Sequence, residues 1–371
     1  MEVLKELPLK FEPFDLGPSL GGSFLDLDFK GRDLEHYKQF SDEAEERFLR
    51  NSKGEILARA VFFTKDFHQK DRGKIKVLIV SNIRTVNSRE ALLGWSELLL
   101  PEILKFKIDT GSDYAMFYLS RRHRGLFDFF MRPRKVREDQ IRFSHLRTAS
   151  VHITQGVQFF AEDVLEHVRI RRASVSDMSN LEDFIKKGSL HSPVSRFIEE
   201  GSLRQEIKNW KGFDFDNLAL AFDSNDQIVG SLGAYGISGQ AECRFKFDEV
   251  QEPTFLALQT FLKLGSWVTD FRPVLEKQSQ SIKFFTHMYF NNTDIFYTLA
   301  RWWIRETKLD RSLFLHPYYQ GDMIGAPSDS LYTSGFTGDL FLVQKEGDPP
   351  SDLLKPALFS NALDIDLPYF F

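Results

Sequence analysis

The chain has 371 residues, more than the roughly 250–300 at which a single hydrophobic core stops growing, so two domains are expected. Its 42% hydrophobic and 27% charged residues are ordinary for a globular protein, and the formal net charge of -5 argues against nucleic-acid binding, which needs a basic surface. The single cysteine, Cys243, excludes an internal disulfide and a multi-thiolate metal site.

The beginning of the sequence carries neither the basic segment nor the continuous apolar run of a secretory signal. No stretch approaches the about 18 apolar residues that a membrane-spanning helix needs. The histidines are dispersed, and none forms a His-x-x-x-His pair. We therefore expect a cytoplasmic protein without membrane insertion and without a bound metal.

The first half of the chain reads as two strands, a helix and a third strand. Residues 55–63 and 74–84 have strand character, and the second of these is apolar enough for a central strand. Asn87-Ser88-Arg89-Glu90 is typical of a helix start, and Pro101 should kink or split that helix. Residues 114–119 return to strand character, so the helix is long enough to serve as a parallel crossover.

The second half repeats this order. Its predicted elements are a strand at 168–173, helical stretches at 179–187 and 193–210, a hairpin of 218–222 with 228–235, a strand at 282–290, a helix capped within 291–294 and a strand at 312–315. Ser179, three residues before Glu182, is the expected cap of the first of these helices. A two-stranded β return should close each half, at 140–158 and at 331–343. This repetition predicts an N-terminal domain over 1–160 and a C-terminal domain over 161–346. An extended tail should follow over 347–371, with Pro368-Tyr369-Phe370-Phe371 as a candidate apolar hook.

Two segments carry a family resemblance. Residues 168–177 read Val-Arg-Ile-Arg-Arg-Ala-Ser-Val-Ser-Asp, and residues 227–235 read Gln-Ile-Val-Gly-Ser-Leu-Gly-Ala-Tyr. They resemble the opening strand and helix, and the second and third strands, of the GNAT superfamily of N-acyltransferases. The resemblance covers roughly 168–345 and rests on element order alone over 55–158. It implies a mixed α/β (α+β) fold of two tandem GNAT-like domains, each with a mixed central sheet flanked by helices.

Neither half has the family's Gly-rich loop, whose backbone N–H groups hold the pyrophosphate of acetyl-CoA. The matching places read Thr85-Val-Asn-Ser-Arg-Glu-Ala-Leu-Leu-Gly94 and Phe290-Asn-Asn-Thr-Asp-Ile295. Glu90 and Asp294 put negative charge there, which opposes an anion by about 0.3–1 kcal/mol each. The second half has no compensating base and resembles a degenerate site.

The first half has basic residues that compensate. Arg84 and Arg89 flank the helix start, and Arg121-Arg122-His123-Arg124 follows the next strand, so both groups belong to one edge of the sheet. Arginine suits phosphate because it is planar, bidentate and always charged. The alternative is a solvated basic loop. The candidate residues for binding acetyl-CoA or another acyl-CoA are Arg84, Val86, Asn87, Ser88, Arg89, Arg121, Arg122 and Arg124.

Acyl transfer to an amine needs a base for the ammonium and an acid for the leaving thiolate. The resembled family commonly uses Tyr as the acid. The candidates are Tyr118 and His123 in the first half and His287 and Tyr289 in the second. Each has an alternative role as a hydrogen-bonded structural residue.

The sequence thus favours an N-acyltransferase-like enzyme that moves an acyl group from a CoA-type donor to an amine of a small molecule or peptide. One alternative is a catalytically decayed acyltransferase-like binding protein. Another is an aminoacyl-transferase relative that uses a non-CoA donor. The missing Gly-rich loop counts in favour of both alternatives.

Overall fold

The computed structural model describes residues 25–29, 34–41, 43–70, 72–86, 88–120, 141–155, 165, 167–189, 194–236, 241–245, 282–307, 313–319, 333–345 and 369. For some of these, among them 141–155 and Arg84, the backbone alone is described.

The elements of the first half are β1 (Leu25–Phe29), α1 (Leu34–Lys38), β2 (Glu45–Arg50), β3 (Ile56–Gln69), β4 (Gly73–Thr85), α2 (Arg89–Gly94), the π-helical turn η1 (Trp95–Leu99), α3 (Leu100–Asp109), β5 (Tyr114–Ser120) and β6 (Ile141–Gln155). The second half contains β7 (Arg169–Arg172), the 3-10 turn η3 (Val175–Asp177), α5 (Met178–Ser189), β8 (Val194–Arg196), α6 (Ser202–Asn209), the 3-10 turn η4 (Phe215–Asn217), β9 (Leu218–Phe222), β10 (Ile228–Gly236), β11 (Ala241–Phe245), β12 (Ile282–Phe290), α9 (Thr293–Glu306), β13 (Leu313–Tyr319) and β14 (Thr333–Lys345).

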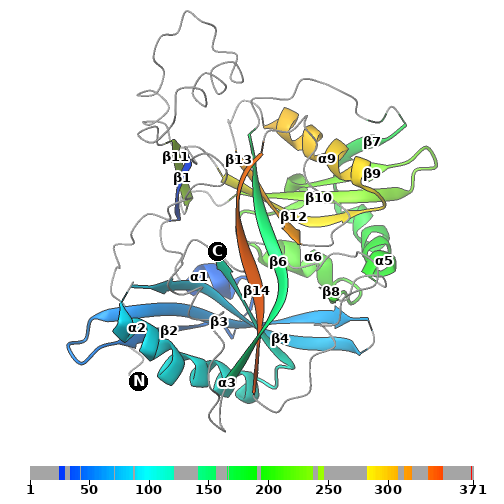
Figure 1. Ribbon diagram of the computed structural model, residues 1–371. Helices are drawn as coiled ribbons and strands as arrows, with labels where there is room; N and C mark the ends of the chain where they lie inside the picture. Colours follow the sequence, from blue (N-terminus) through cyan, green and yellow to red (C-terminus); the bar gives the residue numbers. More distant parts are fainter. Residues whose placement is uncertain are drawn as a thin grey trace, which may run out of the picture.

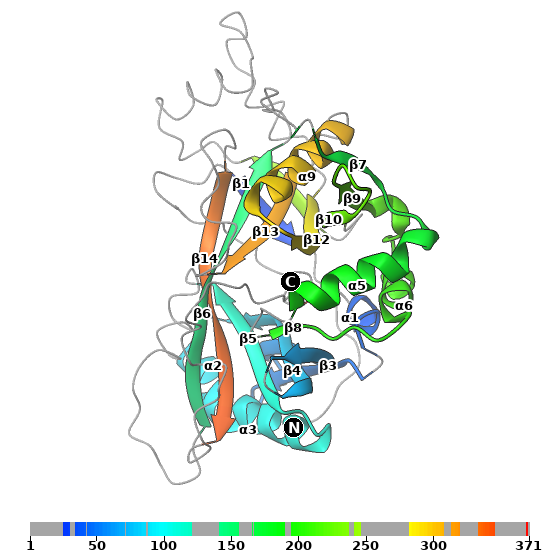
Figure 2. The same cartoon turned by 90° about the vertical axis from the view of Figure 1, so that its right-hand side faces the viewer.

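One sheet runs through both halves (Figures 1 and 2). Its strand order is β2-β3-β4-β5-β14-β6-β13-β12-β10-β9-β7, with β8 paired to β3, and β1 pairs separately with β11. The long strands β6 and β14 pair along their whole length and join the two halves. The expected two-stranded returns at 140–158 and 331–343 are therefore wrong. Each is a single strand, because each finds its partner in the other half and needs no turn of its own.

Helical backbone runs without a break from Arg89 to Asp109, so the expected split at Pro101 is wrong, and a π-helical turn lies just before Pro101 instead. α2, the π-helical turn η1 and α3 follow one another directly, and Pro101 lies in the first turn of α3. Proline has no backbone N–H to donate to the carbonyl group of the preceding turn. A π-helical turn is a common local rearrangement where such a helical hydrogen bond is missing.

The hairpin of β9 and β10 and the helix start after β12 are confirmed. The side chain of Asn292 accepts a hydrogen bond from the Ile295 backbone N–H at 3.0 Å and caps α9. Gly230 of the hairpin lets this helix pack closely, because a Cβ there would lie 2.5 Å from the side chain of Ile295.

Two other predictions for the second half are wrong. The start of α5 is prepared by a capping box of Ser174 and Asp177, not by Ser179 with Glu182. Glu182 is buried and accepts backbone hydrogen bonds from Gly201 and Leu203, so it caps α6 instead. The stretch 193–210 is not one helix. Its first residues form β8, which pairs with β3, and α6 begins only after them.

The sheet has helices on both faces, which gives three hydrophobic clusters. The central cluster lies between the halves, where α1, α5 and α6 are placed in Figure 2, and it includes Phe63, Trp210 and Tyr369. A second cluster lies under α3 in the first half, and a third lies under α9 in the second. Tyr369 belongs to the expected C-terminal hook and is the one residue of 347–371 that the structure describes.

Candidate functional site

The parallel strands β4 and β5 part near their carboxyl ends. Their ladder ends at Val80 opposite Phe117, yet β4 continues to Thr85 and β5 to Ser120. Backbone groups beyond the end of a ladder need other partners. The carboxyl ends of parallel strands are also where α/β folds bind ligands. This parting is therefore the first place to look for a site.

A β-bulge lies on β4 at this parting. Its pairing with β3 shifts between Ser81 and Arg84, so Asn82 and Ile83 oppose the single residue Ala60. Asn82 has φ 46°, in the left-handed region that Asn adopts more readily than most residues. Strained backbone of this kind is often found at functional sites.

Ser81, beside the bulge, is 1% exposed. Among the residues that the structure describes, nothing accepts from or donates to its hydroxyl. A buried hydroxyl without a partner costs roughly 1–3 kcal/mol. Its presence at the parting indicates a place for a group that the described residues do not supply.

The second half has the same bulge at the equivalent place. β12 and β13 are parallel, and their ladder ends at Phe284 on β12. Beyond it, His287 and Met288 oppose the single residue Leu232 of β10. His287 has φ 51° and is therefore the counterpart of Asn82. The backbone geometry is duplicated in the two halves.

Protein groups fill the second bulge. The buried His287 ring stacks on Phe213 with centroids 5.0 Å apart and meets Trp210 edge-on at 5.3 Å. Its Nδ1 lies 3.0 Å from Thr286 Oγ1. Its carbonyl oxygen accepts a hydrogen bond from the Ser231 hydroxyl at 3.0 Å. Protein groups thus pack around the bulge of the second half.

The protonation state of His287 agrees with a packing role. Burial, and next the positive charge of Arg196, lower the pKa of His287 well below its ordinary value. The imidazole is therefore neutral at neutral pH.

The first-half residues predicted to bind the donor lie around the start of α2. Ser88 accepts a hydrogen bond from the Ala91 backbone N–H at 3.1 Å, as a capping residue does. Arg89 begins α2 and is exposed, and Val86 is 44% exposed. Arg84 lies on β4 opposite Arg59. Asn87, Arg121, Arg122, His123 and Arg124 lie outside the described residues and stay predictions.

Tyr118 lies on β5 just beyond the last residue that pairs with β4, and it is 8% exposed. Its phenol end lies over Gly338 of β14, where an added Cβ would be 2.4 Å from the hydroxyl oxygen. β14 adjoins β5 on the side away from β4. Tyr118 therefore lies next to the parting along β5, while its ring packs against β14.

Tyr289 follows the second bulge on β12 and is half-buried. It packs against the central cluster that contains Trp210 and Phe213, the two rings that contact His287. His287 and Tyr289 therefore lie on the same side of the strand. Tyr118 belongs to the same central cluster.

The sequence reasoning missed Ser81 and Asn82. The available signal was weak: two polar residues, Ser81 and Asn82, interrupt an otherwise apolar strand between Val80 and Ile83. Nothing in the sequence marks a left-handed residue at Asn82.

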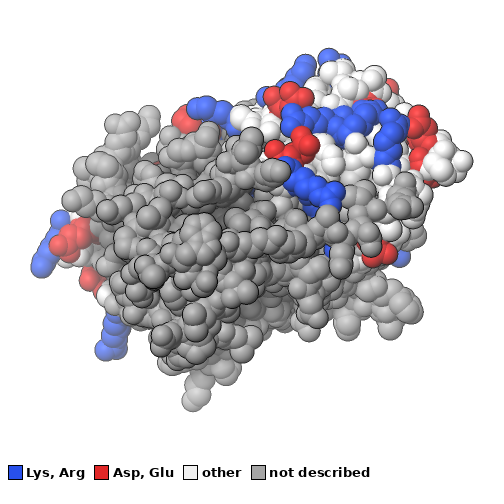
Figure 3. Space-filling model, turned by 90° about the horizontal axis from the view of Figure 1, so that it is seen from above, with Lys and Arg blue, Asp and Glu red and all other residues white. Residues whose placement is uncertain are grey.

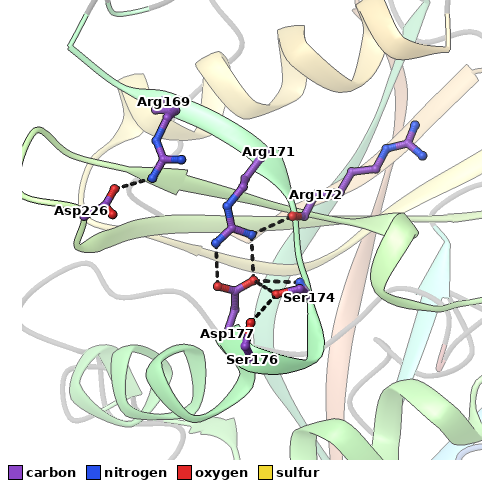
Figure 4. Close-up of polar contacts among 7 residues, drawn as sticks. All are labelled: Arg169, Arg171, Arg172, Ser174, Ser176, Asp177 and Asp226. Carbon is purple, nitrogen blue, oxygen red and sulfur yellow. Dashed lines mark hydrogen bonds and ion pairs between the residues drawn. The ribbon is translucent and has the colours of Figure 1, made fainter.

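The arginine-alternating strand β7 is held by ion pairs (Figure 4). Arg171 donates two hydrogen bonds to the Asp177 carboxylate, at 2.7 and 2.6 Å. This contact, with further hydrogen bonds from Ser174, lowers the pKa of Asp177 to about 2. Arg169 pairs with Asp226. These residues, which carry part of the family resemblance, tie β7 to its neighbours and have a structural role.

Basic and acidic side chains are interleaved on the described part of the face seen in Figure 3. Arg172 and Glu306, for example, form an ion pair at 3.3 Å. Within the described ranges, no three His, Cys, Asp or Glu residues lie close enough together to hold a metal ion. The described helices include none with the length and apolar character to cross a membrane.

No protein-family model matches the sequence, and no curated protein matches it. Solved structures do match. A GCN5-related N-acetyltransferase from Sphaerobacter thermophilus matches with a TM-score of 0.49 and 10% identity, over 81% of this chain and 80% of that one. A Saccharomyces cerevisiae N-myristoyltransferase with bound myristoyl-CoA and inhibitors matches with a TM-score of 0.50 and 8% identity, over 92% of this chain and 78% of that one. The fold is of the GNAT type. The predicted mixed α/β fold class is therefore confirmed, and at these identities the GNAT-type likeness concerns the fold alone.

Proposed function

We propose that the protein is an N-acyltransferase that transfers an acyl group from a CoA-type thioester to an amine of a small molecule or peptide. The observation that carries the proposal is the parting of β4 and β5 at a bulge, with the buried Ser81 hydroxyl left without a partner among the described residues. The GNAT-type fold supports it. A cytoplasmic location stays a prediction.

In the proposed reaction the amine nitrogen attacks the carbonyl carbon of the thioester. The C–N bond forms, the C–S bond breaks, and the proton lost by the amine ends on the thiol of CoA. Negative charge grows on the carbonyl oxygen in the transition state. We assign its stabilisation to the Ser81 hydroxyl and to backbone N–H groups at the Asn82 bulge, because preorganised donors are most effective there.

The phosphates of the donor are assigned to the start of α2. Arg89 is exposed at the first turn of a helical run that continues to Asp109, and the positive end of a helix favours an anion. Arg84 and the group Arg121, Arg122 and Arg124 are proposed to add positive charge. Val86, Asn87 and Ser88 are proposed to supply the backbone of the loop that faces the phosphates.

Tyr118 is the proposed proton donor to the leaving thiolate, and His123 stays a candidate base. The phenol contact with Gly338 offers a purely packing role as the alternative for Tyr118. We assign no proton transfer to His287, because it is buried and enclosed by aromatic rings and its lowered pKa makes it a weak base. We assign none to Tyr289, because it packs against the same central cluster.

Calorimetric titration with acetyl-CoA and longer acyl-CoAs tests the proposal. We expect saturable binding that Arg89→Glu weakens about 3- to 10-fold, because the substitution reverses a charge at the phosphates. Arg204→Glu is the matched control, since Arg204 is an exposed arginine on α6. Absence of binding to every acyl-CoA at millimolar concentration would remove the CoA-type donor from the proposal.

A further inference from the structure

Tyr369 lies in a cage built from both halves of the chain. It is 1% exposed, and the rings of Phe40, Phe63 and Trp210 surround it with centroids 5.1, 6.2 and 6.0 Å away. Phe40 and Phe63 come from the first half, and Trp210 follows α6 in the second. The Lys65 ammonium lies 5.5 Å from the centroid of the Tyr369 ring, a cation–π distance.

A buried carboxylate binds the phenol hydroxyl. Tyr369 donates a hydrogen bond to Glu206 Oε1 at 3.2 Å, and Lys65 Nζ donates to the same oxygen at 3.0 Å. Arg196 Nη1 lies 3.3 Å from Glu206 Oε2. Burial acts to raise the pKa of Glu206, but the positive charges of Arg196 and Lys65 outweigh it and hold this pKa below its ordinary value. The carboxylate is therefore ionised.

Apolar packing alone does not account for these charged groups. The side chains of Lys65, Glu206 and Arg196 are only 17, 13 and 3% exposed, and removing charges from water is costly unless they are well paired. A phenyl ring in an apolar core would need none of them. A carboxylate that accepts from a phenol does discriminate between phenol and phenyl, because a ligand without the hydroxyl leaves the site's polar group unpaired.

The cage also has a donor that Tyr369 does not use. Trp210 is 1% exposed, and across the described residues no acceptor is found for its indole N–H. Its ring contacts those of Tyr369, Phe40 and Tyr235. A ligand that adds an acceptor atom beside its aromatic ring would satisfy this group.

We propose that this cage is a binding site for a tyrosine-like phenol group. Tyr369 occupies it within the chain, and a phenol on another molecule occupies it when the Tyr369 side chain is removed. The ligand class is a small phenol or a tyrosyl side chain. The inference does not depend on acyl transfer.

The experiment uses the full chain with Tyr369→Ala and two probes. p-Cresol has the ring and hydroxyl of a tyrosine side chain, and toluene has those of phenylalanine. Calorimetry should show saturable p-cresol binding to the variant, at least about tenfold tighter than toluene, because hydrogen bonds to charged groups are stronger than neutral ones. Wild-type protein should bind neither, since its own Tyr369 fills the cage.

Phe314→Ala is the matched control. Phe314 is fully buried against Phe285 in the third cluster, so its removal opens an aromatic site without the carboxylate. It should bind toluene at least as well as p-cresol. If Tyr369→Ala does not fold alone, the yield of folded protein is measured with each probe present during expression, and rescue by p-cresol but not by toluene is the expected result. Equal effects of the two probes, or no effect of p-cresol in either assay, would overturn the proposal.

Discussion

The two halves of the chain hold the same β-bulge and differ in what surrounds it. At His287 a stacked phenylalanine and an edge-on tryptophan pack against the side chain, and the Ser231 hydroxyl donates to the carbonyl oxygen. At Asn82 the neighbouring Ser81 hydroxyl is buried with no partner in the described part of the chain. Duplicated backbone geometry thus does not by itself duplicate a site, because the side chains around it decide whether a ligand is needed.

The largest expected effect separates the candidate acids of the two halves. Tyr118→Phe keeps the ring and removes the hydroxyl, so loss of proton donation should lower kcat about 100-fold. Tyr289→Phe should change kcat less than about twofold, because the second half is assigned no chemistry. Steady-state kinetics with the best acyl-CoA measure both. Equal losses in the two variants would place chemistry in both halves.

The next effect concerns pH and the filled bulge. His287 has its folded-state pKa depressed, so below the ordinary His value of about 6.5 the unfolded chain binds a proton that the folded chain does not. The contribution of the neutral His287 to the free energy of unfolding is complete above that pH. Below it, the contribution falls by about 1.4 kcal/mol per pH unit until the folded-state pKa is reached.

Urea unfolding of wild type and His287→Asn at pH 7.5, 6.0 and 5.0 measures this dependence. The substitution gives the second bulge the residue type of the first, and it should remove this part of the acid sensitivity. An unchanged difference in unfolding free energy between the two proteins at all three values would contradict the assignment.

The smallest effects have opposite signs in the two halves. Ser81→Ala removes a buried hydroxyl that has no partner among the described residues and should raise the free energy of unfolding by about 1 kcal/mol. Ser231→Ala removes a hydrogen bond to the His287 carbonyl and should lower it by about 1 kcal/mol. Denaturant unfolding of both variants in the absence of ligand provides the measurement. A loss of stability at Ser81 as large as that at Ser231 would show that Ser81 is satisfied within the chain.

Local elements were predictable wherever the residues that define them are neighbours in sequence. The β9–β10 hairpin and the Asn292 cap of α9 are set within a few residues, and each was confirmed. The pairing of β6 with β14 was not predictable, because it joins segments almost two hundred residues apart. Both strands were read as short returns for that reason.

Much of the candidate site escaped prediction for a related reason. The start of α2 was marked by the cap at Ser88. The bulge at Asn82 depends on register with β3, and the lack of a partner for Ser81 in the described part of the chain depends on how distant strands pack. Such properties belong to the packed chain and have no sequence signal of their own.

Hydrogen exchange with and without a saturating acyl-CoA tests most directly which half binds the donor. We expect slower amide exchange over residues 79–91, which contain the first bulge and the start of α2, and unchanged exchange over residues 284–295. Protection of 284–295 instead, or no protection of 79–91 under conditions where calorimetry shows binding, would contradict it.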